Sequence, residues 1–546
     1  MFGIERTSRM VSDPTIQKAV AAIQLRSERQ RDVHKLVGSF VDIGILQQLQ
    51  TTNHQIVYGR RGTGKTHILG VLAADFANKA DATVCSIDAR TLGSSSQFSD
   101  LTIPMSRRCL SIFRDILAVV HDELLATIVN RPTERALAAL DELDELARAV
   151  TEPVSESRVK EATFKDTTTA ENAVQINATL GQKESSASGM LGTKRGETVE
   201  TERKEVFSHE DKVIFPAINR ILAGICEKAD TNLFLLIDEW SSLPTDLQPY
   251  LAEFIKRGFL PNPAIVVKIA ALEYKSAFGI QVGPKHAVLG FEVGADIATG
   301  LDLDDYYVFD RNPEQVTMAF AEMLFKHLQS ELPDDYLKDV YQIEAADQLV
   351  KALFTNSTTS FQELVRASEG VARDLINTFV QAFFATQRKG TEKIEKKTIT
   401  EAAHQWFEQE KAKNLDEELS LALQRICRNV IGERKVRSFL VTRELERDDL
   451  IQRFFDARVL HLVRRGYADK DNPGVRYNIF TLDYGTYVDL LGTSRAPQEI
   501  SDNQSDGSPE EFLVPFDDKR RIRRVILTKQ VLYPPQQAVF PQFDGS

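Results

Sequence analysis

Hydrophobic positions in the first 300 residues follow two different periods. Short runs of apolar residues predict buried strands, which we expect at residues 55–58, 83–87, 232–237 and 264–272. Between these runs the apolar residues recur at helical spacing, which predicts helices at residues 66–80, 106–130, 132–150 and 212–229. Strands that alternate with helices are typical of an α/β fold with a parallel sheet.

The pattern changes after residue 305. Helical spacing without strands predicts a separate helical domain, with helices at residues 312–332, 343–354, 362–368 and 372–387. Beyond residue 412 the pattern predicts a helix, a short strand, a second helix and an alternating, glycine-punctuated ribbon, at residues 415–429, 439–442, 444–464 and 466–480. Helices followed by a β-ribbon predict a winged helix.

Two segments differ from the rest by their polar composition. Ser, Thr, Gly, Lys and Glu dominate residues 151–206, which we interpret as an excursion inserted into the α/β core. The C-terminal end reads as a linker and tail, in which we expect one structured piece at residues 525–532. The predicted division is therefore a core at 1–305, a helical lid at 306–411, a winged helix at 412–495, and a linker and tail at 496–546.

One glycine-rich segment lies between the first predicted strand and the next helix. It reads Gly59-Arg60-Arg61-Gly62-Thr63-Gly64-Lys65-Thr66 and matches the pattern G-x-x-x-x-G-K-[ST]. Glycines let the backbone wrap phosphates closely, and main-chain N–H groups with the helix N-terminus form an anion cradle. Lys65 supplies a cation to the β and γ phosphates, and the Thr66 hydroxyl coordinates Mg²⁺. The loop and the adjoining His67 therefore predict an ATP-binding site.

An acidic pair, Asp238 and Glu239, follows the apolar strand at 232–237. The carboxyl ends of parallel strands are where such a sheet holds its ligands. We expect Asp238 to hold Mg²⁺ together with Thr66, and Glu239 to act as the general base that activates water. Taken alone, such a pair is more often a strand end at the surface, and it is the phosphate loop upstream that favours the catalytic interpretation.

Four segments together resemble a known family. They are residues 58–67 (YGRRGTGKTH), 237–244 (IDEWSSLP), 303–306 (LDDY) and 368–374 (SEGVARD). The resemblance is to bacterial AAA+ ATPases related to the replication-initiator (origin-recognition and cell-division-cycle) proteins, and it spans roughly residues 40–491. It implies an AAA+ core with a helical lid, ATP hydrolysis with Mg²⁺, and contact between Arg373 and the γ-phosphate. Without the family context, Arg373 would be read as paired with a nearby acid.

Two further parts of the family's site have no assigned residue. Glu273 follows the strand at 264–272, where the resemblance leads us to expect the Asn, Ser or Thr of sensor 1. A neighbouring subunit would supply an arginine finger, for which Arg257, Lys275 and Arg311 are candidates that spacing does not separate.

Charge is unevenly distributed. The chain has a formal net charge of −12, which argues against nucleic acid covering its whole surface. Residues 425–465, however, contain eleven basic and six acidic side chains, a local balance of +5. Arginine suits phosphate because its planar fork makes paired hydrogen bonds, and we select Arg443, Arg458, Arg464 and Arg465 as candidates for double-stranded DNA. The alternatives are a solvated face of ion pairs, or a domain that binds protein.

These observations predict an ATP-driven switch that forms a homo-oligomer and acts on DNA, with another protein supplying any effector activity. Phage defence or mobile-element biology is a conceivable setting from the resemblance. The alternative is a nucleotide-regulated signalling ATPase whose C-terminal domain binds a protein. Four dispersed cysteines argue against disulfides and structural zinc. Apolar runs are too short to cross a bilayer and the N-terminus lacks a signal-peptide pattern, so we expect no membrane contact and a cytoplasmic location.

Overall fold

The structure is a computed structural model. It describes residues 10–23, 32–93, 100–151, 214–283, 287–468, 474–490 and 525–533. The predicted excursion at 151–206 therefore lies outside the described residues, apart from residue 151, as does the predicted linker.

A parallel sheet forms the centre of the first domain, as the strand and helix alternation predicts. Within the described ranges it has five strands in the order β2-β3-β4-β1-β7. Their bounds are β1 Gln55–Tyr58, β2 Ala82–Asp88, β3 Asn232–Asp238, β4 Ile265–Ala271 and β7 Ala298–Asp302. Because all neighbours are parallel, the five carboxyl ends lie at one edge of the sheet.

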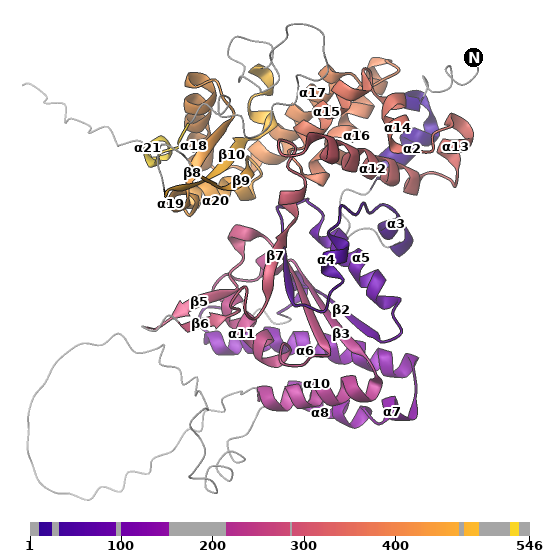
Figure 1. Ribbon diagram of the computed structural model, residues 1–546, viewed down its shortest axis with the longest axis vertical. Helices are drawn as coiled ribbons and strands as arrows, with labels where there is room; N and C mark the ends of the chain where they lie inside the picture. Colours follow the sequence, from indigo (N-terminus) through magenta and orange to yellow (C-terminus); the bar gives the residue numbers. More distant parts are fainter. Residues whose placement is uncertain are drawn as a thin grey trace, which may run out of the picture.

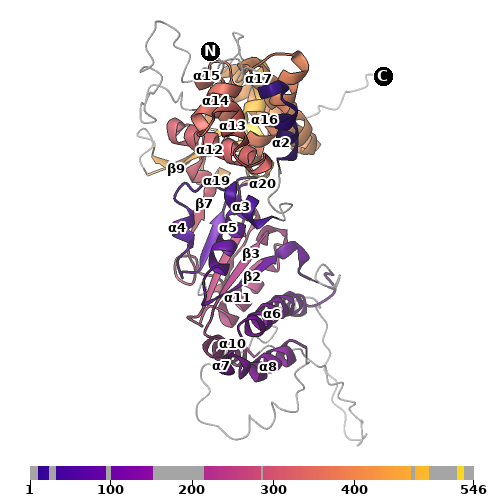
Figure 2. The same cartoon turned by 90° about the vertical axis from the view of Figure 1, so that its right-hand side faces the viewer.

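Helices cover both faces of the sheet because side chains on each strand alternate between two apolar clusters. Ile56 packs in the cluster that joins the sheet to α6, α8, α10 and α11. Its neighbour Val57 packs in the cluster formed with α5 on the opposite face. Figures 1 and 2 show α6 and α11 on one side of the strands and α5 on the other. The bounds of the segments around the sheet are α3 Val33–Gly38, α4 Leu46–Leu49, α5 Lys65–Ala77, η3 Ala89–Thr91, α6 Met105–Asn130, α7 Glu134–Leu137, α8 Leu140–Thr151, α10 Phe215–Ala229, η5 Trp240–Ser242, α11 Gln248–Gly258, η6 Glu273–Lys275 and η7 Leu303–Tyr306.

The sequence pattern does not predict a two-stranded hairpin that lies between β4 and β7. It consists of β5 Gly279–Val282 and β6 Ala287–Gly290 and projects from the side of the core (Figure 1). Its strands are short and largely exposed, so they lack the buried apolar pattern on which strand prediction depends.

The helical domain lies above the sheet in the view of Figure 1. Its helices are α12 Pro313–Glu331, α13 Tyr336–Tyr341, α14 Ala346–Leu353, α15 Ser357–Ala367, α16 Ala372–Lys389 and α17 Lys396–Trp406. The N-terminal segments η1 (Met10–Ser12) and α2 (Pro14–Ala22) pack in the same apolar cluster. The structure thus places these residues with the lid, whereas the predicted boundary put them with the core.

The C-terminal domain is a winged helix. Its elements are α18 Glu417–Cys427, β8 Ser438–Thr442, α19 Arg443–Glu446, α20 Asp449–Asp456, β9 Leu460–Ala468 and β10 Arg476–Leu482. Two π-helical segments, η8 Phe407–Lys411 and η10 Arg428–Glu433, and three short 3-10 helices, η9 Ala412–Asn414, η11 Tyr484–Thr486 and η12 Val488–Leu490, also belong to it. The described strands pair antiparallel in the order β8-β10-β9. The single helix predicted at 444–464 is wrong in two places. Helical structure is interrupted between α19 and α20, where Asp448 caps the second helix, and the chain turns at Arg458 (φ 60°) and continues as β9.

The tail returns to this domain. Leu440 donates its N–H to the carbonyl of Val525 (2.7 Å), and the N–H of Leu527 donates to the carbonyl of Leu440 (2.9 Å). The short helix α21 (Lys529–Leu532) follows, and Leu532 is buried in the core of the domain. The predicted structured piece at 525–532 is therefore part of the winged helix rather than a free tail.

Candidate nucleotide site

The phosphate loop and the acidic pair meet at the carboxyl edge of the sheet. The loop follows β1, the pair Asp238 and Glu239 follows β3, and β4 lies between these two strands. The structure thus brings together two segments that lie more than 170 positions apart in the sequence.

Positive backbone angles shape the loop for an anion. Gly62 and Gly64 have φ values of 89° and 101°, a region that glycine adopts without strain. The Thr63 hydroxyl donates to the carbonyl of Arg60 (2.9 Å), which closes the turn. Helix α5 begins directly after Gly64, so the unpaired backbone N–H groups of its first turn lie next to the loop.

Lys65 is buried inside the loop. Its Nζ donates to the carbonyls of Gly59 (2.7 Å) and Arg60 (2.9 Å). Burial lowers the pKa of Lys65, while the negative charges of Asp304, Glu239 and Asp238 act in the opposite direction. These carboxylates are therefore close enough to stabilise the ammonium group, although burial has the larger effect.

The two residues predicted to hold Mg²⁺ are neighbours in space. Burial raises the pKa of Asp238, and hydrogen bonds from the Thr66 hydroxyl and the Glu239 N–H oppose that effect. The N–H of Glu239 donates to Asp238 Oδ1 at 2.8 Å. A carboxylate beside a hydroxyl, next to a phosphate cradle, is the oxygen donor set that Mg²⁺ prefers, so these residues fit the ion.

Glu239 has a left-handed backbone (φ 53°, ψ 37°). Non-glycine residues adopt this region at a cost of order 1–3 kcal/mol, and active sites and switch regions are among the places where such residues cluster. Its side chain lines the same cavity as the loop.

A cavity of about 360 Å³ lies between the loop, Glu239 and the lid. The predicted site residues that line it are Arg61, Gly62, Thr63, Gly64, Lys65, Thr66, His67, Glu239 and Arg373. The lid is attached directly to the loop, since the N–H of Arg373 donates to the carbonyl of Gly62 (3.0 Å). The charge of Arg373 also contributes to the lowered pKa of Lys65, which indicates that both cations face the same space.

Part of the cavity lining is apolar. Val41 and Ile43 come from the segment before β1, and Met323 and Ile376 come from the lid helices α12 and α16. His67 donates through Nε2 to the carbonyl of Leu36 (2.7 Å), which ties the segment before β1 to α5. Sequence analysis did not find the apolar walls, because nothing in the local pattern separates them from ordinary core residues.

Arg60 is the exception among the loop residues, because its side chain points away from the cavity. It is buried, with Nε donating to Asp304 Oδ1 (2.8 Å) and one terminal nitrogen to the carbonyl of Glu369 (3.1 Å). The other terminal nitrogen bonds Nδ1 of His461 in the winged helix. Arg60 therefore makes its side-chain contacts between domains and is not among the residues that line the cavity.

Two of the arginines predicted to contact DNA also lie between domains. Arg458 is buried against Asp374 of the lid. Arg465 donates to Glu273 (2.6 Å) and Asp302 (2.8 Å), at the ends of β4 and β7. We correct the assignment of both, because guanidinium groups held by carboxylates of this chain do not face a duplex in this arrangement. Arg443 is exposed and Arg464 partly exposed.

The candidate arginine-finger residues are engaged within the chain. Arg257 pairs with Glu253 (2.6 Å), Lys275 with Asp456 (3.3 Å) and Arg311 with Asp305 (3.1 Å). Glu273, which follows β4, is the partner of Arg465, so the structure assigns it to domain contact and leaves sensor 1 without a residue.

The strand order, the phosphate loop and the adjoining lid define a P-loop α/β fold of the AAA+ class, followed by a winged helix. This confirms the predicted fold class. Within the described ranges, no helix combines the length and the apolar character that crossing a membrane requires.

Several solved structures are similar to the chain over most of its length, and they are AAA+ replication initiators. The Aeropyrum pernix ORC2 protein in its ADPNP–ADP complexes is 10% identical, with a TM-score of 0.36, and the match covers 84% of this chain and 96% of that one. Cdc6p from Pyrobaculum aerophilum is 12% identical, with a TM-score of 0.30 and coverage of 88% and 95%. The Aeropyrum pernix ORC1 protein in complex with DNA is 11% identical, with a TM-score of 0.31 and coverage of 83% and 93%. A scan against protein-family models and a search of the curated proteins give no match.

Proposed function

We propose that this chain binds ATP with Mg²⁺ and hydrolyses it to ADP and phosphate, and that the nucleotide switches the arrangement of core and lid. The observation that carries the proposal is the convergence of Lys65, Thr66, Glu239 and Arg373 on one cavity, with Asp238 hydrogen-bonded to Thr66 beside it. Each of these side chains has the chemistry that its position requires.

The loop amides and the ammonium group of Lys65 bind the β and γ phosphates. Thr66 and Asp238 would hold Mg²⁺, which neutralises charge on the phosphate oxygens. Glu239 orients the attacking water and accepts its proton. Arg373 donates to the γ-phosphate from the lid, so that the triphosphate bridges two domains and departure of the γ-phosphate frees the lid arginine.

Glu239→Gln tests the chemical step. The amide keeps the shape of the side chain but cannot accept the proton, so steady-state phosphate release should fall by about 10²–10⁴-fold. Affinity for a fluorescent ATP analogue should change little, whereas Lys65→Ala should lose it. Hydrolysis by Glu239→Gln at the wild-type rate would remove Glu239 as the base. A wild-type chain that binds ATP without turnover would favour the signalling alternative.

The second candidate function is binding of duplex DNA through the winged helix. Its support is an exposed pair, Arg443 at the start of α19 and Arg447 directly after this helix, beside the strands β9 and β10. Exposed arginines near a wing suit the phosphate backbone.

Charge reversal tests this candidate. Arg443→Glu with Arg447→Glu should weaken duplex binding and reduce the salt slope of log K by about one for each DNA phosphate that the variant no longer binds. Arg388→Glu, at an exposed position of the lid, serves as the matched control. An unchanged slope would exclude α19 from the interface and leave a protein partner as the alternative for this domain.

A further inference from the structure

Arg60 is the only one of the loop's two arginines whose side chain reaches all three domains in the part of the chain that the structure describes. Asp304 of the core accepts from both its backbone N–H (2.7 Å) and its Nε (2.8 Å). The carbonyl of Glu369, in the lid loop that leads to Arg373, accepts from the same guanidinium group (3.1 Å). His461 of the winged helix is the third partner, and the Phe455 ring lies 5.6 Å from the guanidinium carbon.

The contact with His461 fixes the state of the imidazole. Arginine has no acceptor, so Nδ1 of His461 must accept, and the ring proton therefore lies on Nε2. This Nε2–H donates to Asp483 Oδ2 at 2.8 Å. Burial and the charge of Arg60 lower the pKa of His461 to about 3, against the opposing effect of Asp483. His461 is thus a neutral link that accepts from the phosphate loop and donates into the winged helix.

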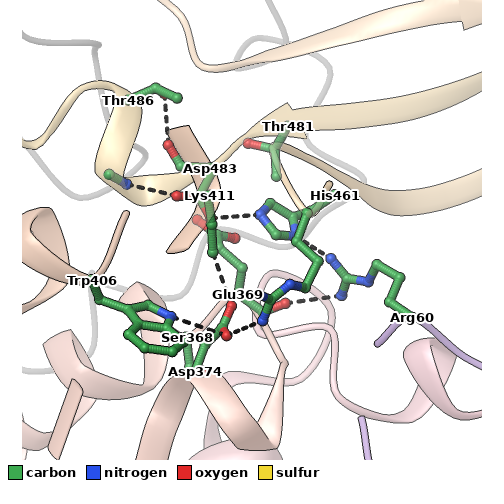
Figure 3. A network of polar contacts seen from close by, with 12 residues as sticks. Arg60, Ser368, Glu369, Asp374, Trp406, Lys411, His461, Thr481, Asp483 and Thr486 are labelled. Atoms are coloured by element: carbon green, nitrogen blue, oxygen red, sulfur yellow. Dashed lines mark hydrogen bonds and ion pairs between the residues drawn. The ribbon is translucent and has the colours of Figure 1, made fainter. Parts of the chain in front are cut away.

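The chain of contacts then returns to the lid, as Figure 3 shows. Lys411 is buried between Asp483 and Asp374, with its Nζ 2.9 Å from Asp374 Oδ2. Asp374 also pairs with Arg458 and accepts from Trp406 Nε1 (3.1 Å). Its neighbour Arg373 donates its backbone N–H to Gly62, which closes the path within the phosphate loop.

The path is balanced in charge. Three cations, Arg60, Lys411 and Arg458, face three carboxylates, Asp304, Asp374 and Asp483. All six groups are buried or nearly so. Removing one member leaves a buried charge without its partner, which is costly, so the path holds only when core, lid and winged helix are docked together.

We propose that Arg60 is a positioning residue that couples nucleotide binding to docking of the winged helix, through His461, Asp483, Lys411 and Asp374. This inference rests on the proposed nucleotide site. Docking of the winged helix holds Arg60 in the phosphate loop through His461. It also holds Asp374, the neighbour of Arg373, through Lys411 and Arg458. A loop that is already ordered binds phosphate more tightly, and coupling is reciprocal, so nucleotide strengthens docking.

Substitutions at His461 test the coupling at a distance from the phosphates. His461→Leu fills the volume but neither accepts from Arg60 nor donates to Asp483, and should weaken ATP affinity at least fivefold, about the lower end of typical couplings. His461→Gln keeps one acceptor and one donor and should recover part of the loss. A protein that only loses packing would not distinguish the two variants in this way. Arg428→Ala, at an exposed position of the same domain, should bind ATP as the wild type does.

Arg60→Met is the second test of the coupling, and it leaves the hydrogen bond between His461 and Asp483 in place. It should weaken ATP affinity, and adding His461→Leu should cause little further loss, because both changes break one path. In hydrogen exchange, ATP should protect peptides of α20 and β9 in the wild type but not in Arg60→Met.

The outcomes separate the two proposals. A wild-type chain that binds no ATP would overturn the proposed function. A wild-type chain that binds ATP, with variants of unchanged affinity, additive losses, or α20 and β9 equally protected by ATP in Arg60→Met, would overturn the coupling alone. If His461→Leu does not fold, Arg60→Met and the exchange measurement still decide.

Discussion

Gly62 shows how a single residue joins the phosphate loop to the lid. A Cβ atom at this position would lie 2.8 Å from the Cβ of Arg373 and 3.2 Å from Cγ1 of Val371. The same residue accepts the N–H of Arg373 at 3.0 Å. Gly64 has a similar backbone (φ 101°), but a Cβ there would meet no atom of the described residues within 4 Å. A side chain at Gly64 would therefore introduce backbone strain alone, whereas a side chain at Gly62 would introduce the same strain and a clash with the lid.

Alanine at each position makes the distinction measurable. Both substitutions carry the cost of a left-handed backbone, about 1–2 kcal/mol. Gly62→Ala must in addition push the start of α16 away from the loop. We expect hydrogen exchange in the first turn of α16, measured without nucleotide, to rise in Gly62→Ala and to stay at the wild-type level in Gly64→Ala. Equal exchange in both variants would show that the lid does not depend on this contact.

At the scale of elements, sequence analysis succeeds where the signal is local. The loop between β1 and α5 is defined by its glycines and by the change of period on either side, and the buried strand before Asp238 is a continuous apolar run. The prediction of a helix up to residue 464 is wrong because the local signal there is ambiguous. Apolar residues at 460, 462 and 463 fit either period, and pairing with β10 decides for a strand.

The candidate site is predictable in part. The residue types for phosphate and metal follow from the motif, but a motif does not indicate which of two adjacent arginines faces the ligand. Arg61 lines the cavity, whereas Arg60 turns toward His461, about 400 positions later in the sequence. The same limit applies to Arg458 and Arg465. Their carboxylate partners belong to other domains, so the sequence around each arginine does not predict the ion pair.

At the scale of the whole molecule, the winged helix rests on the carboxyl edge of the sheet and on the lid (Figures 1 and 2). The contact at the sheet edge carries an excess of negative charge. Arg465 is shared by Glu273 (2.6 Å) and Asp302 (2.8 Å), and Glu446 lies 4.0 Å away. Burial, opposed by Arg465, raises the pKa of Glu273 to about 7. One guanidinium group cannot neutralise three partly buried carboxylates, so protonation of Glu273 relieves the repulsion among them as the pH falls below about 7.

Docking should therefore depend on pH in a defined direction. A carboxyl group whose pKa is raised in the docked state contributes stability that is fully present below its ordinary value, about 4.5, and is lost as the pH rises through about 7. Small-angle X-ray scattering should show a larger radius of gyration at pH 8 than at pH 6. Glu273→Gln resembles the protonated form and leaves Arg465 paired with Asp302, so the variant should stay compact at both values. A wild-type radius that does not change over this range, or a Gln variant that expands as the wild type does, would show that Glu273 does not control docking, because its proton would then be bound equally in the docked and undocked states.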